Sequence, residues 1–379
     1  MKHDVYQLAV SMIRGFLRVT QAPWRWFFRH FSKTGYLVNL IASADPKGEG
    51  STVMLDFYEK NASFLPYAEN DYFLRLNTGL EKVAIILQGP VCHRHNFTLE
   101  TIRRYRRLYP DIRIYLSTWD NEKVDFDPET EGFTLIRNPL PENRGHGNIN
   151  CQILSTRYGL EAAKRDGCRW AMKTRTDFRF YDWQLPHWYL SLLEEFPVRG
   201  KGLKSRIIVL EASRFMPFFI DDFCMFGEIS DLEFFWNVPL RNTSGGILRI
   251  NTPDELLRMN EIYEPQPCSE IYLYSSFANR LGDPCEVKSA ADYYQFLDDR
   301  LILTNWDQWL HFKYNTFNFL PRRSMSSYPN YMTFRDWLCL YRDREKYTSF
   351  DVSAIMKLSP FDRIPVSTES NVNPKEKKL

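Results

Sequence analysis

Two cationic side chains and a carboxylate, Lys173, Arg175 and Asp177, lie at the end of a predicted buried strand and just beyond it. An Arg guanidinium presents a planar fork to phosphate oxygens, and an Asp carboxylate can hold Mg²⁺ or Mn²⁺ through oxygen. This segment therefore predicts a site for a diphosphate, bound directly or through a divalent cation on Asp177. The same residues at a strand end are also compatible with a solvated or internally paired charge cluster.

The segment Gln88-Gly89-Pro90 follows another predicted strand, and its residue types suit contact with a nucleoside. Glycine lets a ligand come close to the backbone, and a glutamine amide can pair with the edge of a base. A third segment, 145–152, leads into a predicted helix whose free N–H groups favour anions, although Asn148 could equally serve as an ordinary helix cap. The predicted binding residues are Gln88, Gly89, Pro90, Ser117, Thr118, Asn150, Gln152, Lys173, Arg175 and Asp177.

Asp222 is the predicted general base for a reaction at this site, and Glu270 is the second candidate. Asp222 lies in the apolar run 218–227, where a carboxylate is either a paired structural group or a base poised by partial burial. Asp298 and Asp299 are expected to be surface acids. His93 and His95 have no Cys neighbours, so no metal site is predicted there.

Apolar runs and turn residues predict an α/β fold around these segments. Four strands are predicted, at 83–87, 112–117, 133–136 and 169–173. A helix capped by Thr98 ends before Pro110, and a longer helix begins near Ile149 and ends before Gly167. Strands that alternate with helices form a mostly parallel sheet flanked by helices, and ligands bind at the carboxyl ends of such strands. The polar segments should therefore converge at one edge of the sheet.

The composition is that of a globular protein. The 379 residues are 44% apolar and 25% charged with a net charge of +2, so a strongly basic nucleic-acid surface is not indicated. Seven scattered cysteines without a C-x-x-C pair fit a reducing compartment, and the chain is expected in the cytoplasm. Neither G-x-G-x-x-G nor G-x-x-x-x-G-K-[ST] occurs, which argues against hydride transfer and P-loop phosphoryl transfer.

Residues 1–34 carry a net charge of +5 and differ from the rest of the chain. Their apolar side chains from Val5 to Leu17 follow the spacing of an amphipathic helix, and Trp, Phe and Arg alternate after Pro23. This composition favours peripheral contact with the cytoplasmic face of an inner membrane, with packing on the catalytic domain as the alternative. The predicted organisation is an N-terminal segment, 1–80, a catalytic domain, 81–350, and a C-terminal extension with a basic tail, 351–379.

Several short blocks, taken in order, resemble the WavE lipopolysaccharide synthesis family of glycosyltransferases between Lys82 and Tyr347. The blocks are Ile85 to Val91, Thr101 to Arg103, Leu116 to Trp119, Asn148 to Gln152 with Ser155 and Thr156, Lys173 to Asp177, Asp222 with Phe226 and Gly227, and Glu270 to Tyr272. The resemblance implies a GT-A-like nucleotide-sugar-binding fold. It also implies transfer of a sugar from a nucleotide donor to a lipid-linked or growing oligosaccharide of lipopolysaccharide, capsule or a related polysaccharide.

The sequence departs from the expected family pattern at two positions. Asp177 keeps only the second acid of an Asp-x-Asp metal motif, so Arg175 or Lys173 is an alternative to Mg²⁺ or Mn²⁺ in neutralising the diphosphate. Cys151 stands where a basic residue is expected, and Arg144 or Arg157 could supply that phosphate contact.

Two other functions stay open at this stage. The first is a non-catalytic glycan- or nucleotide-binding partner in a polysaccharide assembly complex, which the incomplete metal motif favours. The second is a nucleotidyltransferase, although the Gly-rich loop bearing Arg or Lys that such an enzyme needs after its first strand is missing. Donor hydrolysis by the purified protein separates the enzyme from the binding partner.

Overall fold

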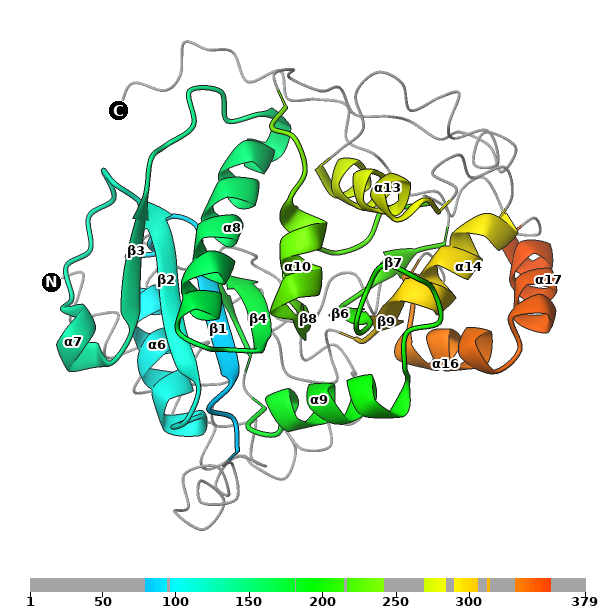
Figure 1. Ribbon diagram of the computed structural model, residues 1–379, viewed down its shortest axis with the longest axis horizontal. Coiled ribbons are helices and arrows are strands. Elements are labelled where there is room, and N and C mark those ends of the chain that lie inside the picture. The colour runs from blue at the N-terminus through cyan, green and yellow to red at the C-terminus, as the bar shows by residue number, and fades with distance from the viewer. Residues whose placement is uncertain are drawn as a thin grey trace, which may run out of the picture. The chain divides into compact units, whose positions relative to one another are not determined.

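A seven-stranded sheet organises the part of the chain that the computed structural model describes (Figure 1). That part comprises residues 79–93, 96–180, 182–214, 217–241, 269–283, 290–305, 312–313 and 331–355. The predicted amphipathic N-terminal helix and most of the C-terminal extension lie outside these residues. One helix, α17 (Arg344–Ile355), runs across the boundary predicted at residue 350.

The strands are arranged in the order β3-β2-β1-β4-β8-β6-β9. Their bounds are β1 Val83–Gln88, β2 Arg113–Trp119, β3 Thr134–Asn138, β4 Trp170–Arg175, β6 Ile207–Val209, β8 Met225–Glu228 and β9 Leu301–Leu303. The first four are mutually parallel, β9 is parallel to β6, and β8 runs antiparallel to both of its neighbours. The predicted α/β fold with a mostly parallel sheet is therefore confirmed.

Strand β1 lies where the order of the parallel strands reverses, with β2 on one side and β4 on the other. Gln88, its last residue, pairs with Ser117 of β2 and with Arg175 of β4. β1 and β4 therefore end at the same level, and β2 continues two residues further, to Trp119. In open sheets of this kind, ligands bind outside the carboxyl ends at the point where the order reverses. This topology positions the candidate site.

Helices cover both faces of the sheet. Right-handed crossovers in opposite directions along the sheet place α6 (Phe97–Leu108) and α8 (Ile149–Arg165) on opposite faces, and α10 (Ile229–Trp236) packs beside α8 (Figure 1). The remaining helices are α7 Pro128–Glu131, α9 Leu185–Glu195, α13 Ser269–Leu281, α14 Ala290–Arg300 and α16 Phe334–Arg342. Short strands β5 Phe178–Arg179, β7 Ala212–Ser213, β10 Phe312–Lys313 and β11 Tyr331–Met332 form two small ribbons.

The predicted cap of α6 is wrong. Asn96, not Thr98, occupies the N-cap position, and Thr98 lies inside the first turn. The Thr98 hydroxyl donates instead to the backbone carbonyl of Thr176, at 3.0 Å. A buried hydroxyl needs a partner, and Thr98 finds it in the loop after β4 rather than in its own helix.

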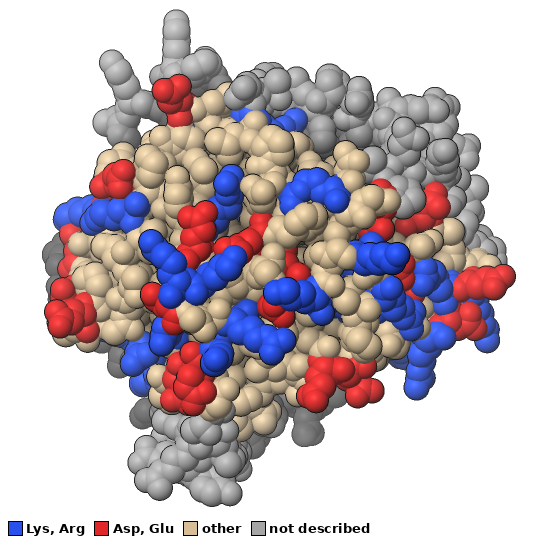
Figure 2. Space-filling view, viewed as in Figure 1, with Lys and Arg blue, Asp and Glu red and all other residues tan. Residues whose placement is uncertain are grey.

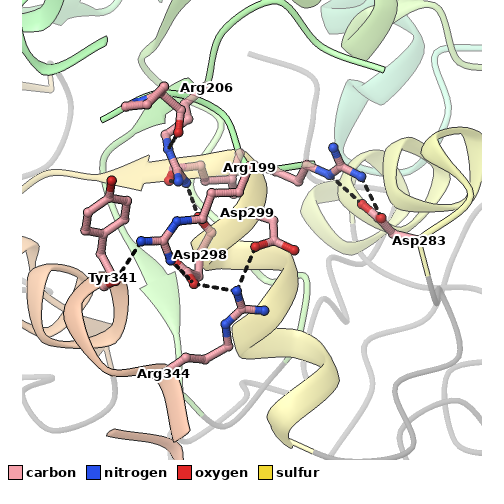
Figure 3. Close-up of polar contacts among 10 residues, drawn as sticks. Arg199, Arg206, Asp283, Asp298, Asp299, Tyr341 and Arg344 are labelled. Carbon is pink, nitrogen blue, oxygen red and sulfur yellow. Dashed lines mark hydrogen bonds and ion pairs between the residues drawn. The ribbon is translucent and has the colours of Figure 1, made fainter. Parts of the chain in front are cut away.

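An ion-pair network around Asp298 connects the C-terminal helices to the chain before β6 (Figure 3). Asp298 is completely buried and lies 2.8 Å from Arg199 and 2.8 Å from Arg344, which also reaches Asp299 at 2.9 Å. Arg199 donates further to the carbonyl of Tyr341, at 2.9 Å. The expectation that Asp298 is a surface acid is wrong, because cationic side chains from distant segments compensate the carboxylate inside the fold.

The start of α16 is stabilised by Asp336, whose carboxylate accepts hydrogen bonds from the backbone and hydroxyl of Thr333 at 2.8 and 2.6 Å. Arg214 pairs with the same oxygen at 2.7 Å. Burial alone would raise the pKa of Asp336, but Arg214 and Thr333 outweigh burial and hold that pKa below its ordinary value. Ionised Asp336 therefore stabilises the folded chain.

Charges of both signs are mixed on the face shown in Figure 2. Lys164 lies 2.5 Å from Glu233, and Arg169 and Lys204 both pair with Glu228. A mixed, paired surface lacks the single-sign field that attracts nucleic acid. None of the helices in the described part of the chain has the length and apolar character needed to cross a lipid bilayer.

Candidate functional site

A pocket of about 650 Å³ opens at the carboxyl ends of β1, β2 and β4. It is lined by Gln88, Gly89, Pro90, Val91, Cys92, His93, Trp119, Asn121, Glu122, Leu140, Arg144, Gly147, Asn148, Cys151, Gln152, Arg175, Thr176 and Asp177. The loops after all three strands and the first turn of α8 therefore contribute to one cavity. Its volume is typical of sites for nucleotide-sized ligands.

Hydrogen bonds between the loops after β1 and β4 build one wall of the pocket. The Thr176 amide donates to the Gln88 carbonyl at 3.1 Å, and the Thr176 hydroxyl donates to the Pro90 carbonyl at 2.5 Å. Gly89 has a φ of +117°, and a Cβ there would lie 3.3 Å from the Thr176 hydroxyl. Glycine is required because the backbone turns sharply against this threonine. The wall is thus fixed before any ligand binds.

Arg175 and Asp177 face the pocket as a bidentate ion pair. Nε and Nη2 of Arg175 donate to the two carboxylate oxygens of Asp177 at 2.7 and 2.9 Å. Burial alone would lower the pKa of Arg175, but Asp177, and more weakly Asp222 and Asp221, raise that pKa above its ordinary value. Arg175 is therefore a permanent cation whose fork is occupied by its own neighbour, as the internally paired alternative anticipated.

The N-terminal end of α8 supplies positive potential to the opposite wall. Gly147 and Asn148, which precede the helix, both adopt left-handed conformations, with φ of +61° and +60°. The Asn148 side chain makes no capping hydrogen bond, so it does not act as the ordinary cap considered for it. Arg144 is exposed and lines the same wall, whereas Arg157 does not line the pocket. A helix N-terminus beside an arginine suits an anionic ligand.

Glu122 and His93 line the pocket beyond the ends of β2 and β1, and neither is among the predicted site residues. Oε1 of Glu122 accepts a hydrogen bond from the Val91 amide at 3.1 Å and lies 3.6 Å from Nε2 of His93. The rule that ligands bind beyond strand carboxyl ends would have pointed to Glu122, three residues after β2. His93 was considered only as a metal ligand.

Two predicted glutamines line the pocket in different ways. Gln88 is buried, and its Oε1 accepts a hydrogen bond from the Ser155 hydroxyl of α8 at 2.9 Å. Gln152 is partly exposed, and its buried Oε1 has no hydrogen-bond partner among the described residues. An unsatisfied acceptor in a pocket wall is available to a ligand N–H or O–H group.

Three other predicted contacts lie behind the pocket wall. Ser117 is buried and donates to the Ser155 carbonyl at 2.6 Å, and Thr118 is buried beside it on β2. Asn150 is 1% exposed, and its amide donates to the carbonyls of Asn143 and Arg241 at 2.8 and 2.7 Å. Ser117 and Thr118 point to opposite faces of a sheet that helices cover on both sides, and Asn150 is buried on α8, so these side chains support the site rather than line it.

Lys173 and Asp222 also lie behind the pocket. Lys173 is completely buried, donates from Nζ to the backbone carbonyl of Asp222, and lies 4.7 Å from the centre of the Trp236 ring. Burial lowers the pKa of Lys173 below its ordinary value, and Asp222 opposes this effect. Asp222 is 2% exposed, and its Oδ2 has no hydrogen-bond partner among the described residues. Asp222 does not line the cavity. Its charge instead raises the pKa values of Lys173 and Arg175.

Glu270 lies in the first turn of α13, next to the pocket wall. A Cβ on Gly147 would come within 2.9 Å of the Ser269 hydroxyl, so the start of α13 is packed against that glycine. Tyr274, one turn further on, donates to the Asp221 carbonyl at 3.0 Å. Burial raises the pKa of Tyr274 well above its ordinary value, and Asp222, Asp221 and Glu270 raise it further. The two predicted bases thus lie in one acidic region.

The pocket offers a divalent cation few protein ligands. Among the described residues, no three His, Cys, Asp or Glu side chains lie close enough together to hold a metal ion between them. Asp177 alone lies on the wall near Arg175, and both of its oxygens accept from that arginine. This donor set fits the mode in which Mg²⁺ is held by one carboxylate and the phosphates of a substrate.

The order of the short segments around this pocket can be compared with known families. A sequence model described as WavE lipopolysaccharide synthesis matches residues 83–360, more than half of the chain. The chain belongs to the WavE lipopolysaccharide synthesis family. The matched region begins at β1 and includes every residue that lines the pocket. No curated protein sequence matches this WavE-family chain.

Two solved structures are similar to parts of the chain. One is the "Putative Glucose-1-Phosphate Thymidylyltransferase from Bacillus anthracis" in complex with a sucrose, 12% identical over 41% of this chain and 75% of its own, with a TM-score of 0.26. The other is the "mannose-1-phosphate geranyltransferase from Thermus thermophilus", 13% identical over 58% of this chain and 69% of its own, with a TM-score of 0.26. At these TM-scores, neither similarity identifies the fold.

Proposed function

We propose that this chain is a glycosyltransferase that moves a sugar from a nucleotide-sugar donor to a lipopolysaccharide, capsule or related surface-polysaccharide acceptor. The observation that carries the proposal is the pocket where the strand order reverses, which combines Arg175, Arg144 and the N-terminus of α8. Membership of the WavE family supports a role in lipopolysaccharide synthesis. The GT-A assignment of the α/β fold belongs to the same proposal.

The donor would span the pocket. The nucleoside would lie against Gln88, Gly89 and Pro90, with the residues from Trp119 to Glu122 beside it, and the diphosphate would face Arg175 and Arg144. Negative charge grows on the nucleoside diphosphate as the sugar leaves. A guanidinium fork and a helix N-terminus already in place stabilise that charge without reorganisation.

A divalent cation, where one is bound, would be held by Asp177 together with the donor's phosphates. It would add neutralising charge at the leaving group. Because Arg175 occupies both oxygens of Asp177 in the free protein, Arg175 must first transfer its hydrogen bonds to phosphate oxygens. Donor binding would thus free the Asp177 carboxylate for the cation by drawing Arg175 to the phosphates.

Glu270 and Asp222 are the proposed general bases, which would take the proton from the hydroxyl group that receives the sugar. Glu270 is the better placed, because it is partly exposed and adjoins Ser269, which packs on the pocket residue Gly147. Asp222 has an unpaired oxygen but is 2% exposed, so we propose that it chiefly orients Arg175 and Lys173. We also propose that the protein acts at the cytoplasmic face of the inner membrane, with residues 1–34 as the membrane contact.

A second function is favoured by two observations. The Arg175–Asp177 pair is closed and Asp222 is buried, as expected if the pocket binds a nucleotide or glycan without transferring a sugar. The chain would then be a non-catalytic partner in polysaccharide assembly. Both functions need a ligand in the pocket, but only the enzyme releases nucleoside diphosphate from a nucleotide sugar.

Thermal unfolding across UDP-, GDP-, CMP- and dTDP-sugars, with and without Mn²⁺, tests the proposal. A ligand at 100 times its Kd stabilises the folded state by about 2.7 kcal/mol, so one nucleotide class should raise the Tm by several degrees. Release of nucleoside diphosphate from that donor then distinguishes the enzyme from the binding partner. If no nucleotide sugar shifts the Tm, the pocket is not a donor site.

A further inference from the structure

An apolar groove of about 340 Å³ lies directly beside the candidate donor pocket. Its walls include Leu140, Leu154, Leu240, Pro139 and Pro141. Leu240 is 41% exposed and stands out as an exposed large apolar side chain in the described part of the chain. Exposed apolar surface gathered in a concave site marks a place where an apolar ligand binds.

The groove and the pocket share a wall. Leu140 lines both cavities, and α8 faces the pocket with Cys151 and Gln152 and the groove with Leu154. The segment after α10, which carries Leu240, runs up beside the N-terminal end of α8 (Figure 1). A single elongated molecule can therefore occupy the groove with one end and reach the pocket with the other.

Asn150 holds the groove in shape. Its amide nitrogen donates to the carbonyl of Asn143 in one wall, at 2.8 Å, and to that of Arg241 behind the other, at 2.7 Å. Its side-chain oxygen accepts from the Arg241 amide at 2.7 Å. The buried side chain thus joins two segments about ninety positions apart in sequence, as its pairing with Arg241 shows. A groove fixed in this way does not have to be ordered when its ligand binds.

The lining identifies the chemical class of the ligand. None of the described residues that line the groove is aromatic, whereas sugar rings are usually held on aromatic faces. Glu142 is the only charged residue among the described lining residues; it is exposed and would repel an anionic head group. Leucine and proline walls without a cation suit an uncharged aliphatic chain.

We propose that this groove binds the aliphatic chain of a lipid-linked acceptor and so directs the acceptor's hydroxyl-bearing head into the pocket. The inference rests on the proposed transferase function, whose acceptor it specifies. The chain enters from the side of Leu240, passes Leu154 and reaches the shared wall at Leu140. A free oligosaccharide without such a chain would be the weaker acceptor.

Binding of octyl, nonyl and decyl β-D-glucoside below their micelle-forming concentrations tests the groove. Each buried methylene should tighten Kd about fourfold, so decyl glucoside should bind about fifteenfold more tightly than octyl glucoside. Leu240→Asp places a charge in the groove at an exposed position and should abolish this dependence on chain length. Asn237→Asp adds the same charge to the exposed start of the same segment, outside the groove, and should leave the dependence intact.

The outcomes separate the two proposals. Equal Kd values along the series, or equal weakening by both variants, would overturn the groove assignment even if a nucleotide sugar binds to every variant. If no donor binds to the wild type but the chain-length dependence is preserved, the transferase proposal and the acceptor role fail, whereas the groove still binds an aliphatic chain. If Leu240→Asp instead converts a dimer into a monomer in sedimentation, the groove is an interface between two copies and the acceptor assignment fails.

Discussion

Replacing Arg175 with Gln should weaken binding of the nucleoside diphosphate more than any other single change in the pocket. The side chain is about a quarter exposed, and its fork already binds one pair of carboxylate oxygens with good geometry. A hydrogen bond to a charged group contributes about 1.5–3 kcal/mol. Its loss should therefore raise the Kd for the diphosphate about 10- to 150-fold.

Two further variants define the cause. Arg175→Lys keeps the charge but loses the fork, so its Kd should lie between those of the wild type and Arg175→Gln. Arg169→Gln is the matched control, because Arg169 is exposed at the other end of β4, where it pairs with Glu228. Its Kd should equal that of the wild type. Calorimetry with the nucleoside diphosphate measures all four proteins.

Asp177→Asn gives a result of opposite sign. In EDTA this change releases Arg175 from its bidentate partner, so the diphosphate should bind more tightly than to the wild type. With Mn²⁺ present, the variant should lose whatever additional affinity the wild type gains. Unchanged binding in Arg175→Gln, or equal weakening in Arg169→Gln, would refute the assignment of the diphosphate to this end of β4.

Three further changes test other parts of the structure. Asp336→Asn should cost about 1–3 kcal/mol of unfolding free energy at pH 7; because the pKa of Asp336 is lowered, this difference should shrink as the pH falls below 4, measured by urea unfolding. Gly147→Ala should weaken donor binding, since its Cβ would lie 2.9 Å from the Ser269 hydroxyl. Gly167→Ala has open space around its Cβ, so it should lower the unfolding free energy by roughly 1–2 kcal/mol, the strain of a left-handed backbone, and leave donor binding unchanged. The nucleotide should protect Cys92 in the pocket from alkylation, measured by mass spectrometry, while exposed Cys339 reacts equally with and without it.

The parallel half of the sheet was predictable because its signals are local. The apolar run 83–87 and the polar residues that follow it mark β1 and its carboxyl end, and β4 is marked in the same way. Gln88, Arg175 and Asp177 therefore line the pocket as expected. Strands β6, β8 and β9 were not predicted, because they are only three or four residues long and pair with distant segments.

Whether a side chain is buried or lines the pocket was harder to predict than the face of the strand on which it lies. Lys173 and Arg175 are two residues apart, so they share a face of β4, and the sequence gives no reason to separate them. Lys173 pairs across with Met225 of β8 and is buried, whereas Arg175 extends past that pairing and reaches the pocket. Asn150 was misassigned for a similar reason, since its partner Arg241 lies far away in sequence.

The antiparallel strand β8 explains why acids and bases meet behind the pocket. Because Lys173 pairs with Met225 and the strands run in opposite directions, the residues just before β8 lie beside those that follow Lys173 on β4. Asp222 is thereby brought to Lys173 and within electrostatic reach of Arg175. A parallel strand at this position would have carried Asp222 to the far edge of the sheet. The one antiparallel strand in the described sheet thus brings a buried carboxylate that adds to the effect of Asp177 in raising the pKa of Arg175, at the point where we propose that the leaving diphosphate is bound.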